Sequence, residues 1–253
     1  MAVIEREETA ALDEGYMLNP VDAARASIMI NHDAFREWLS GPQSSALLVN
    51  GNTDLAANEG SSPFSLVCAQ LSVTMDMDSQ AFVVRWFGDN HRHPQAYTDS
   101  KDLIDIPREM LASLIGQLVW QLRRRNLVVD FSFMKKADWH HVADFTLNSL
   151  TRTFRELVAQ LPASSIFTII IDEIDQYEVG ETSNNIFTIL RRLLRTVHEV
   201  GKMIKLIATC RGKSTSIREL FAEGNVLEMP QDVEGDDGAL WLVRNMERPR
   251  RRT

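Results

Sequence analysis

The chain has 253 residues, of which 44% are hydrophobic and 25% charged, and its formal net charge is −8. This length and apolar content suffice to bury a sizeable core, which excludes the disordered class. The negative charge argues against broad electrostatic capture of nucleic acid or acidic membranes. No apolar run reaches the roughly 18–20 residues that a membrane span needs, so no membrane segment is expected.

The cysteines and the chain ends indicate the compartment. Cys68 and Cys210 lie far apart in apolar stretches, which favours two reduced core residues over a disulfide. The first fifteen residues are too acidic for a signal or transit peptide. We therefore expect an intracellular, cytoplasmic protein. The terminal ERPRRRT is read as a solvated basic tail, with a nuclear signal as the alternative.

The first predicted element is a loose N-terminal arm. The first 25 residues lack strong periodicity, and we assign residues 1–30 to this arm. NHDAFREWLS then predicts a short helix at 31–40, with Asn31 or Asp33 as its cap.

A strand, a loop and a helix follow. SALLVNG (45–51) is typical of a buried strand, and a polar, Gly- and Ser-rich loop spans 50–62. Pro63 is a favoured first residue of the next helix. AFVVRWFG (81–88) predicts a second strand, which a polar loop or insertion follows.

The second half alternates helices and strands. Apolar residues at steps of three and four predict helices from Pro107 onward, over 144–161 and over 184–201. Apolar runs rich in β-branched residues predict strands at 165–175 and 203–210.

The series closes with a helix over 214–223, a strand at 225–230 and a helix over 236–247. Such alternation, with most strands apolar on both faces, predicts an α/β fold with a three-layer architecture, a parallel sheet flanked by helices. We assign residues 31–230 to this domain and 231–253 to a C-terminal helix and basic tail. We expect the strand at 166–171 to be central, between those at 46–50 and 204–210.

Asp172 and Glu173 end the most apolar strand pattern, IFTIIIDEID. In P-loop NTPases such a strand, called Walker B, delivers a carboxylate to Mg²⁺, and a neighbouring Glu activates the attacking water. Asp172 fits the metal ligand and Glu173 the base. Acids also end ordinary strands, where they are solvated or cap the next turn, and the pattern leaves both interpretations open.

The phosphate loop of such an enzyme would follow Gly51. It cradles phosphate with backbone N–H groups, a lysine and a Ser/Thr hydroxyl. Normal spacing from Gly51 gives no match. In a longer loop Gly60 would be the second glycine, Ser61 would stand at the lysine position and Ser62 at the metal-hydroxyl position. Neither serine supplies a cation.

Two acids, Asp54 and Glu59, add negative charge beside this loop. Like charges in a partly dry pocket repel, so strong ATP binding is not expected, although the helix N-terminus remains a site for a weaker anion.

Arg211 follows the strand at 203–210. Ligands gather at the carboxyl ends of parallel strands, so Arg211 either faces the same crevice as Asp172 and Glu173 or only neutralises the acids. The GKS that follows Arg211 is no phosphate loop, because the turn before it is too short.

These elements, above all IFTIIIDEIDQYE and KLIATCR, resemble the P-loop NTPase core of fungal STAND proteins of the NACHT or nephrocystin-like kind, within the AAA+ relatives. The resemblance covers about residues 31–230. It implies that Asp172 and Asp175 form the acidic pattern that holds Mg²⁺ when nucleotide binds, and that Arg211 is the arginine after the sensor strand. Glu173 resembles the second acid of the AAA+ Asp-Glu pair.

The lysine of the phosphate loop is not carried over, so a degenerate site is expected. We predict a non-catalytic NTPase-like module for protein interaction or scaffolding, with weak or no binding of ATP or ADP with Mg²⁺. Its partners would be proteins or further copies of itself. The alternative is an active ATPase with an atypical loop and Glu173 as catalytic base. The candidate nucleotide contacts are Gly51, Gly60, Ser61, Ser62 and Arg211.

Overall fold

The computed structural model describes residues 2–15, 17–53, 62–88, 100–144, 146–180, 182–236 and 238–239. The strands in these ranges are β1 (Ser45–Asn50), β2 (Ala81–Phe87), β3 (Ile166–Asp172), β4 (Met203–Cys210) and β5 (Val226–Glu228). The α-helices are α1 (Ala2–Gly15), α2 (Pro20–Asn31), α3 (Asp33–Ser40), α4 (Pro63–Asp76), α5 (Ser100–Arg124), α6 (Lys136–Ala143), α7 (Leu147–Ala159) and α8 (Thr182–Glu199). Short 3₁₀ helices are η2 (Ile174–Tyr177), η3 (Ile217–Leu220) and η4 (Glu223–Asn225).

The strands form one all-parallel sheet in the order β2-β3-β4-β1-β5. The strand at 166–171, which we expected to be central, is second in the sheet, and β4 is the middle strand. It is also not flanked by the strand at 46–50, because β4 lies between them. The periodicity of a strand identifies its buried faces but carries no information about its neighbours. The register pairs Asn50 with Cys210 and Phe87 with Asp172, so the strand ends meet at one edge.

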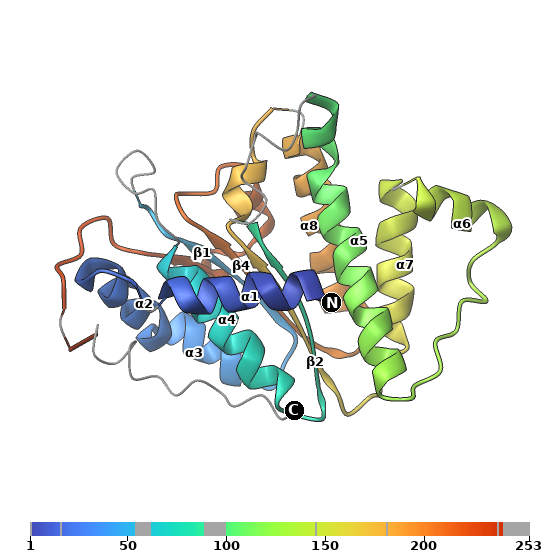
Figure 1. Ribbon diagram of the computed structural model, residues 1–253, viewed down its shortest axis with the longest axis horizontal. Helices are drawn as coiled ribbons and strands as arrows, with labels where there is room; N and C mark the ends of the chain where they lie inside the picture. The colour runs from blue at the N-terminus through green and yellow to red at the C-terminus, as the bar shows by residue number, and fades with distance from the viewer. Residues whose placement is uncertain are drawn as a thin grey trace.

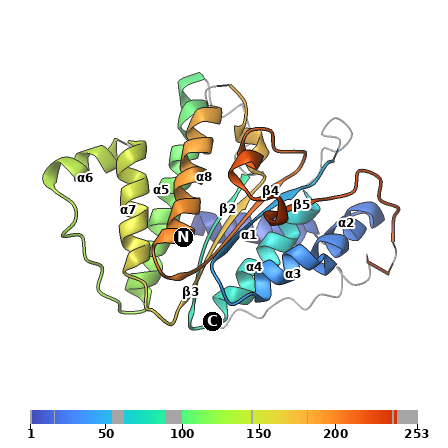
Figure 2. The same ribbon diagram turned by 180° about the vertical axis from the view of Figure 1, so that it is seen from behind.

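Helices cover both faces of the sheet, as the predicted three-layer α/β architecture requires (Figures 1 and 2). Alternate strand residues point to opposite faces. Ile169 and Leu206 pack with α5, α7 and α8, whereas Ile170 and Ile207 pack with α1 to α4. The small helix α6 packs on α7 and projects from the body (Figure 1).

The expected loose N-terminal arm is instead helical. Helix α1 packs on α4 and β2, and α2 packs on α4 and α3. The periodicity of α1 is obscured because Glu7 and Glu8 are buried. Glu8 forms an ion pair with the buried Arg85 of β2, with Arg85 Nε 2.9 Å from Glu8 Oε1. A buried acid breaks the apolar stripe from which a helix is predicted.

Three smaller predictions also change. The cap of α3 is His32, whose Nδ1 accepts from the Ala34 N–H, rather than Asn31 or Asp33. Helix α5 begins at Ser100 and contains Pro107 in its interior.

The predicted helix at 214–223 is reduced to η3. Most of the predicted helix at 236–247 lies outside the described residues. No helix in the described part of the chain combines the length and hydropathy of a membrane-spanning segment.

Candidate functional site

The carboxyl ends of β1, β3 and β4 bring Gly51, Asp172 and Arg211 to the same edge of the sheet. The Gly51 N–H donates to the Cys210 carbonyl at 3.0 Å, which ties the end of β1 to that of β4. This convergence was expected, because parallel strands present their carboxyl ends together.

Asp172 is fully buried and is held by two hydroxyl groups. Ser65 Oγ of α4 donates to one carboxylate oxygen at 2.6 Å, and Thr209 Oγ1 of β4 donates to the other at 2.5 Å. Hydrogen bonds to a charged acceptor are among the stronger ones in proteins. Asp172 therefore joins α4, β3 and β4.

Glu173 follows in a left-handed backbone conformation, with φ 54° and ψ 49°. Its side chain is fully buried, and its N–H donates to Thr209 Oγ1 at 3.1 Å. A non-glycine residue in this region costs of order 1–3 kcal/mol and persists only where its surroundings hold it. Asp172 and Glu173 therefore end β3 in a sharp turn. The hydroxyl group of Thr209 holds this turn, because it donates to the Asp172 carboxylate and accepts from the Glu173 N–H.

Two further carboxylates hold the loop after β4. Asp175 accepts from the N–H groups of Arg211, at 3.1 Å, and Gly212, at 2.8 Å. Glu178 accepts from the N–H groups of residues 215–217 at 2.7 to 3.0 Å. Asp175 thus binds the chain's own backbone, and its partners differ from those of Asp172. Arg211 is itself buried, with 4% of its surface exposed.

The first N–H groups after β1 are also bonded to this loop. Those of Gly51, Asn52 and Thr53 donate to the carbonyl groups of residues 210, 212 and 211, respectively, at 2.9 to 3.2 Å. A phosphate loop directs successive N–H groups of this kind toward its anion. Here the backbone of the neighbouring strand and loop accepts them.

Gly51 is required for steric reasons. A Cβ at this position would lie 2.4 Å from the Arg211 carbonyl oxygen and 2.6 Å from the ring of Phe64. Phe64 is fully buried directly before Ser65. If Ser65, which contacts Asp172, is taken as the metal-hydroxyl position of a phosphate loop, Phe64 occupies the position of the lysine.

Of the remaining predicted loop residues, Ser62 is the one that the structure describes. Ser62 caps α4, where its Oγ accepts from the Phe64 N–H at 3.3 Å. Gly60 and Ser61 lie outside the described residues, as do Asp54 and Glu59. Ser65 takes the place beside Asp172 for which Ser62 was proposed.

Three residues that build this edge are not among the predicted site residues. Ser65 of α4 and Thr209 of β4 both donate hydrogen bonds to Asp172. Arg25 of α2 donates to the carbonyl of Gly51 at 2.9 Å and to that of Gln231 at 2.5 Å. Thr209 could have been recognised from the sequence, because it is a hydroxyl residue near the end of an otherwise apolar strand. Arg25 carried no local signal, because α2 was read as part of an arm.

Both cysteines are free and buried in this region, as expected. Burial raises the pKa of Cys68 well above its ordinary value, and the charges of Asp172 and Glu173 raise it further. Burial likewise raises the pKa of Cys210, with Asp175 as the next cause. Both thiols therefore stay protonated at neutral pH and are poor nucleophiles or metal ligands.

The fit to a nucleotide with Mg²⁺ is poor in the described part of this edge. Its carboxylates accept hydrogen bonds from the protein, and its first N–H groups bond to protein carbonyls. No three His, Cys, Asp or Glu side chains of the described ranges are grouped as a metal ion would need. The arrangement joins β1, β3, β4 and α4 and fixes the loops that leave them.

Comparisons of the chain with family models, with curated proteins and with solved structures gave no match.

Proposed function

We propose that this chain is a P-loop NTPase-like module with a degenerate phosphate site, which acts in protein interaction or as a scaffold and binds nucleotide weakly or not at all. One observation carries the proposal: the groups that would receive phosphate and metal are bonded to each other. Asp172 accepts from Ser65 and Thr209, and the N–H groups after β1 bond to the loop after β4.

Opening this edge for a nucleotide would cost these bonds. A typical hydrogen bond contributes about 0.5–1.5 kcal/mol to stability, and one to a charged group about 1.5–3 kcal/mol. A phosphate that displaced them would need compensating cations. Phe64 stands where such a loop has its lysine, and the guanidinium of Arg25 is bonded to two carbonyl groups.

Calorimetric titration of the full chain with ATP and Mg²⁺ tests the proposal. We expect no saturable heat, or a dissociation constant of about 1 mM or weaker. A low micromolar constant that Asp172→Asn abolishes, and that the surface control Glu219→Gln retains, would overturn the degenerate-site proposal. Circular dichroism establishes that both variants are folded.

The active ATPase remains the second candidate because of the conformation of Glu173. Strained residues cluster at functional sites, and Glu173 pairs a left-handed backbone with full burial beside Asp172. Phosphate release from ATP decides between the two. Activity that Glu173→Gln removes would favour the enzyme. Without activity, Glu173→Gly should relieve the backbone strain, because glycine adopts this conformation freely, while it loses the packing of the buried side chain.

A further inference from the structure

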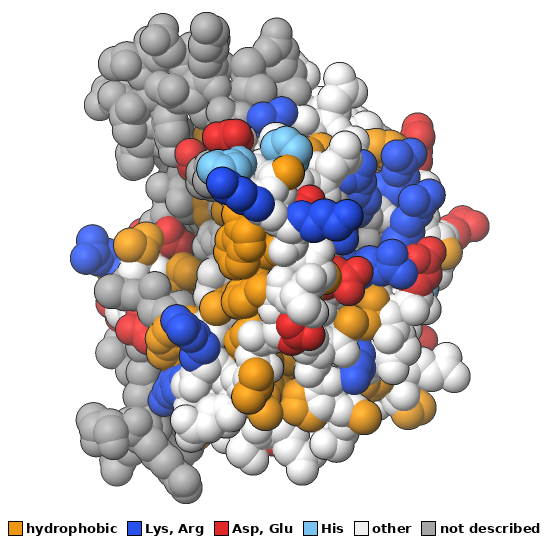
Figure 3. Space-filling model, turned by 90° about the vertical axis from the view of Figure 1, so that its right-hand side faces the viewer, with side chains coloured by type: hydrophobic (Ala, Val, Ile, Leu, Met, Phe, Trp, Pro, Cys, Tyr) orange, Lys and Arg blue, Asp and Glu red, His pale blue; other side chains and the backbone are white. Residues whose placement is uncertain are grey.

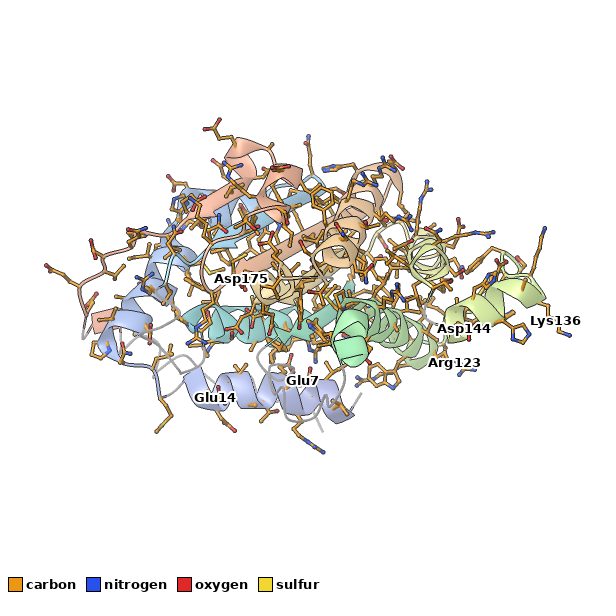
Figure 4. All side chains as sticks on the ribbon, turned by 90° about the horizontal axis from the view of Figure 1, so that it is seen from above. Glu7, Glu14, Arg123, Lys136, Asp144 and Asp175 are labelled. Atoms are coloured by element: carbon orange, nitrogen blue, oxygen red, sulfur yellow. The ribbon has the colours of Figure 1, made fainter. Side chains whose placement is uncertain are left out.

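The two helical layers carry opposite charge. Residues 106–165 and 182–202, which form most of α5, α6 to α8 and their connections, contain twelve Lys or Arg and six Asp or Glu. Residues 2–53 and 62–80, which form α1 to α4 with β1, contain three Arg and ten Asp or Glu. The net charge of −8 is therefore distributed unevenly, with a basic layer and an acidic layer. Glu7, Glu8 and Asp22 are buried, so seven of the ten acids contribute to the acidic surface. Figure 4 shows Glu7 and Glu14 on α1, away from Arg123 and Lys136 on the other layer.

The basic layer presents an exposed aromatic residue on α6. Trp139 is 47% exposed, and its ring lies 5.2 Å from that of Phe131, centroid to centroid. Lys135 and Lys136 are exposed at the start of the same helix. Figure 3 shows this side of the molecule, where a run of hydrophobic side chains is bordered by basic and histidine side chains. Exposed tryptophan beside cations is typical of an interface anchor.

The acidic layer contains an apolar groove between α2, α3 and α4, with a volume of about 210 Å³. Its lining includes Ile30, Phe35, Leu39, Leu66 and Leu71. Leu39 is 40% exposed.

The exposed charged residues of α3, beside this groove, are Asp33, Arg36 and Glu37, which give it a net charge of −1. Asp33 and Glu37 are exposed on α3, which also supplies Phe35 and Leu39 to the groove. The groove is smaller than the roughly 300–1,000 Å³ of small-molecule sites, and its size suits one large side chain.

The anchor and the groove of one chain cannot meet. Helix α6 packs on α7 in the basic layer, whereas the groove belongs to the acidic layer, and Figure 1 shows α6 and α2 at opposite ends of the molecule. A second copy brings the two surfaces together with matching chemistry: an aromatic ring for an apolar groove, and lysines for the carboxylates of Asp33 and Glu37.

We propose that the chain self-associates head to tail, with Trp139 of one copy in the α2–α3–α4 groove of the next and Lys135 and Lys136 against its α3. This inference rests on the proposal that the chain acts through protein contacts. Because the two surfaces differ, the contact is heterologous, so it repeats into a ring or an open filament. Opposite layer charges speed the encounter and make it sensitive to salt.

Sedimentation velocity of the full chain over a range of concentrations tests the proposal. We expect the mass to rise with concentration at low salt and to fall back when salt is raised. Trp139→Ala should weaken association by about 30-fold, as expected of an anchor residue. Leu39→Lys should abolish it, because a cation in the groove repels the incoming lysines. The matched controls are Val128→Ala, 91% exposed on the basic layer, and Met77→Lys, 61% exposed outside the groove.

A mixture of the two variants gives the sharpest result. Trp139→Ala keeps a working groove and Leu39→Lys keeps a working anchor, so an equimolar mixture should form dimers and nothing larger. The variant pair Lys135→Glu and Lys136→Glu, which keeps the tryptophan, should also weaken association. A chain that stays monomeric throughout, or a mixture that does not dimerise, would overturn the inference. Capture of an acidic foreign protein by a monomeric chain would overturn it too. Neither result bears on nucleotide binding, which the ATP titration measures separately.

Discussion

Two polar clusters are buried on the same face of the sheet, and they balance their charge differently. Under α1, the guanidinium of Arg85 lies between Glu8 and Asp76, at 2.9 Å from each. At the strand ends, Asp172 is held by the hydroxyl groups of Ser65 and Thr209. The first cluster is an ion pair that fastens a helix to an edge strand. The second uses neutral donors to join β3 to β4 and α4, which is why we interpret it as a joint.

The largest effect is expected from breaking the ion-pair cluster. Glu8→Ala leaves the buried guanidinium of Arg85 with Asp76, whose side chain is 39% exposed. Removing one partner of a buried pair costs about 3–5 kcal/mol, and we expect about 3 kcal/mol because Asp76 remains. Urea unfolding measures this loss.

The control for this prediction is Asp13→Ala on the exposed side of α1, which should change stability by less than about 0.5 kcal/mol. Replacing both Glu8 and Arg85 with leucine should recover part of the loss. A double variant as unstable as Glu8→Ala would show that the helix packing, and not the charge, is decisive.

A substitution in the strand-end cluster, at Thr209, should lower the free energy of unfolding by less than Glu8→Ala does. Thr209→Val removes both the donor to Asp172 and the acceptor of the Glu173 N–H while keeping the shape. We expect a loss of about 2 kcal/mol in the free energy of unfolding. Thr168→Val on β3 is the matched control, because the buried hydroxyl of Thr168 has no hydrogen-bond partner among the described residues.

Thr168→Val should therefore leave stability unchanged or raise it. Equal losses in the two valine variants would mean that the hydroxyl of Thr209 does not contribute to the joint beyond its packing, and the comparison of the two clusters would fail.

The strands and most helices of this fold could be predicted, because their patterns are local. Strands β1, β2 and β4 begin and end within one or two residues of the prediction. The buried acids of α1 could not be predicted, since Glu8 pairs with Arg85, which is 77 positions away in sequence. The reduction of the predicted helix at 214–223 to η3 could not be predicted either. The N–H groups of residues 215–217 donate hydrogen bonds to the carboxylate of Glu178, which lies in the segment after β3.

The location of the site could be predicted from the sequence, but the hydrogen bonds within it could not. That Gly51, Asp172 and Arg211 share an edge follows from strand direction alone. That Ser65 reaches Asp172 depends on how α4 sits on the sheet, and the strand order that decides this was also missed. Residue spacing identified the candidate carboxylates, while their partners came from elements distant in the chain.

The Gly51→Ala variant tests whether Gly51 is needed for the close packing of β1 against β4 or for binding a phosphate. The added Cβ would meet two carbonyl oxygens and the ring of Phe64 within 2.7 Å. Overpacking of this kind costs about 1–3 kcal/mol, and we expect a loss near 1.5 kcal/mol in the absence of any ligand. The control is Gly116→Ala on α5, where a Cβ meets nothing within 4 Å. That variant should gain about 0.5–1 kcal/mol from helix propensity. Unchanged stability in Gly51→Ala would contradict the tight approach of β1 to β4.

The smallest effect, seen at alkaline pH, comes from the two thiols buried beside the strand-end cluster. Burial and the nearby carboxylates raise the pKa of Cys68 and of Cys210 in the folded chain. The unfolded chain therefore releases these protons first, and stability, complete below the unfolded thiol pKa, falls as pH rises past it. For two thiols with an unfolded pKa near 8.5, the loss between pH 7 and pH 8.5 is about 0.8 kcal/mol. Urea unfolding at both pH values measures it, and Cys68→Ala should halve it. A stability that rises over this interval would show that burial and the nearby carboxylates do not hold the thiols in their protonated form.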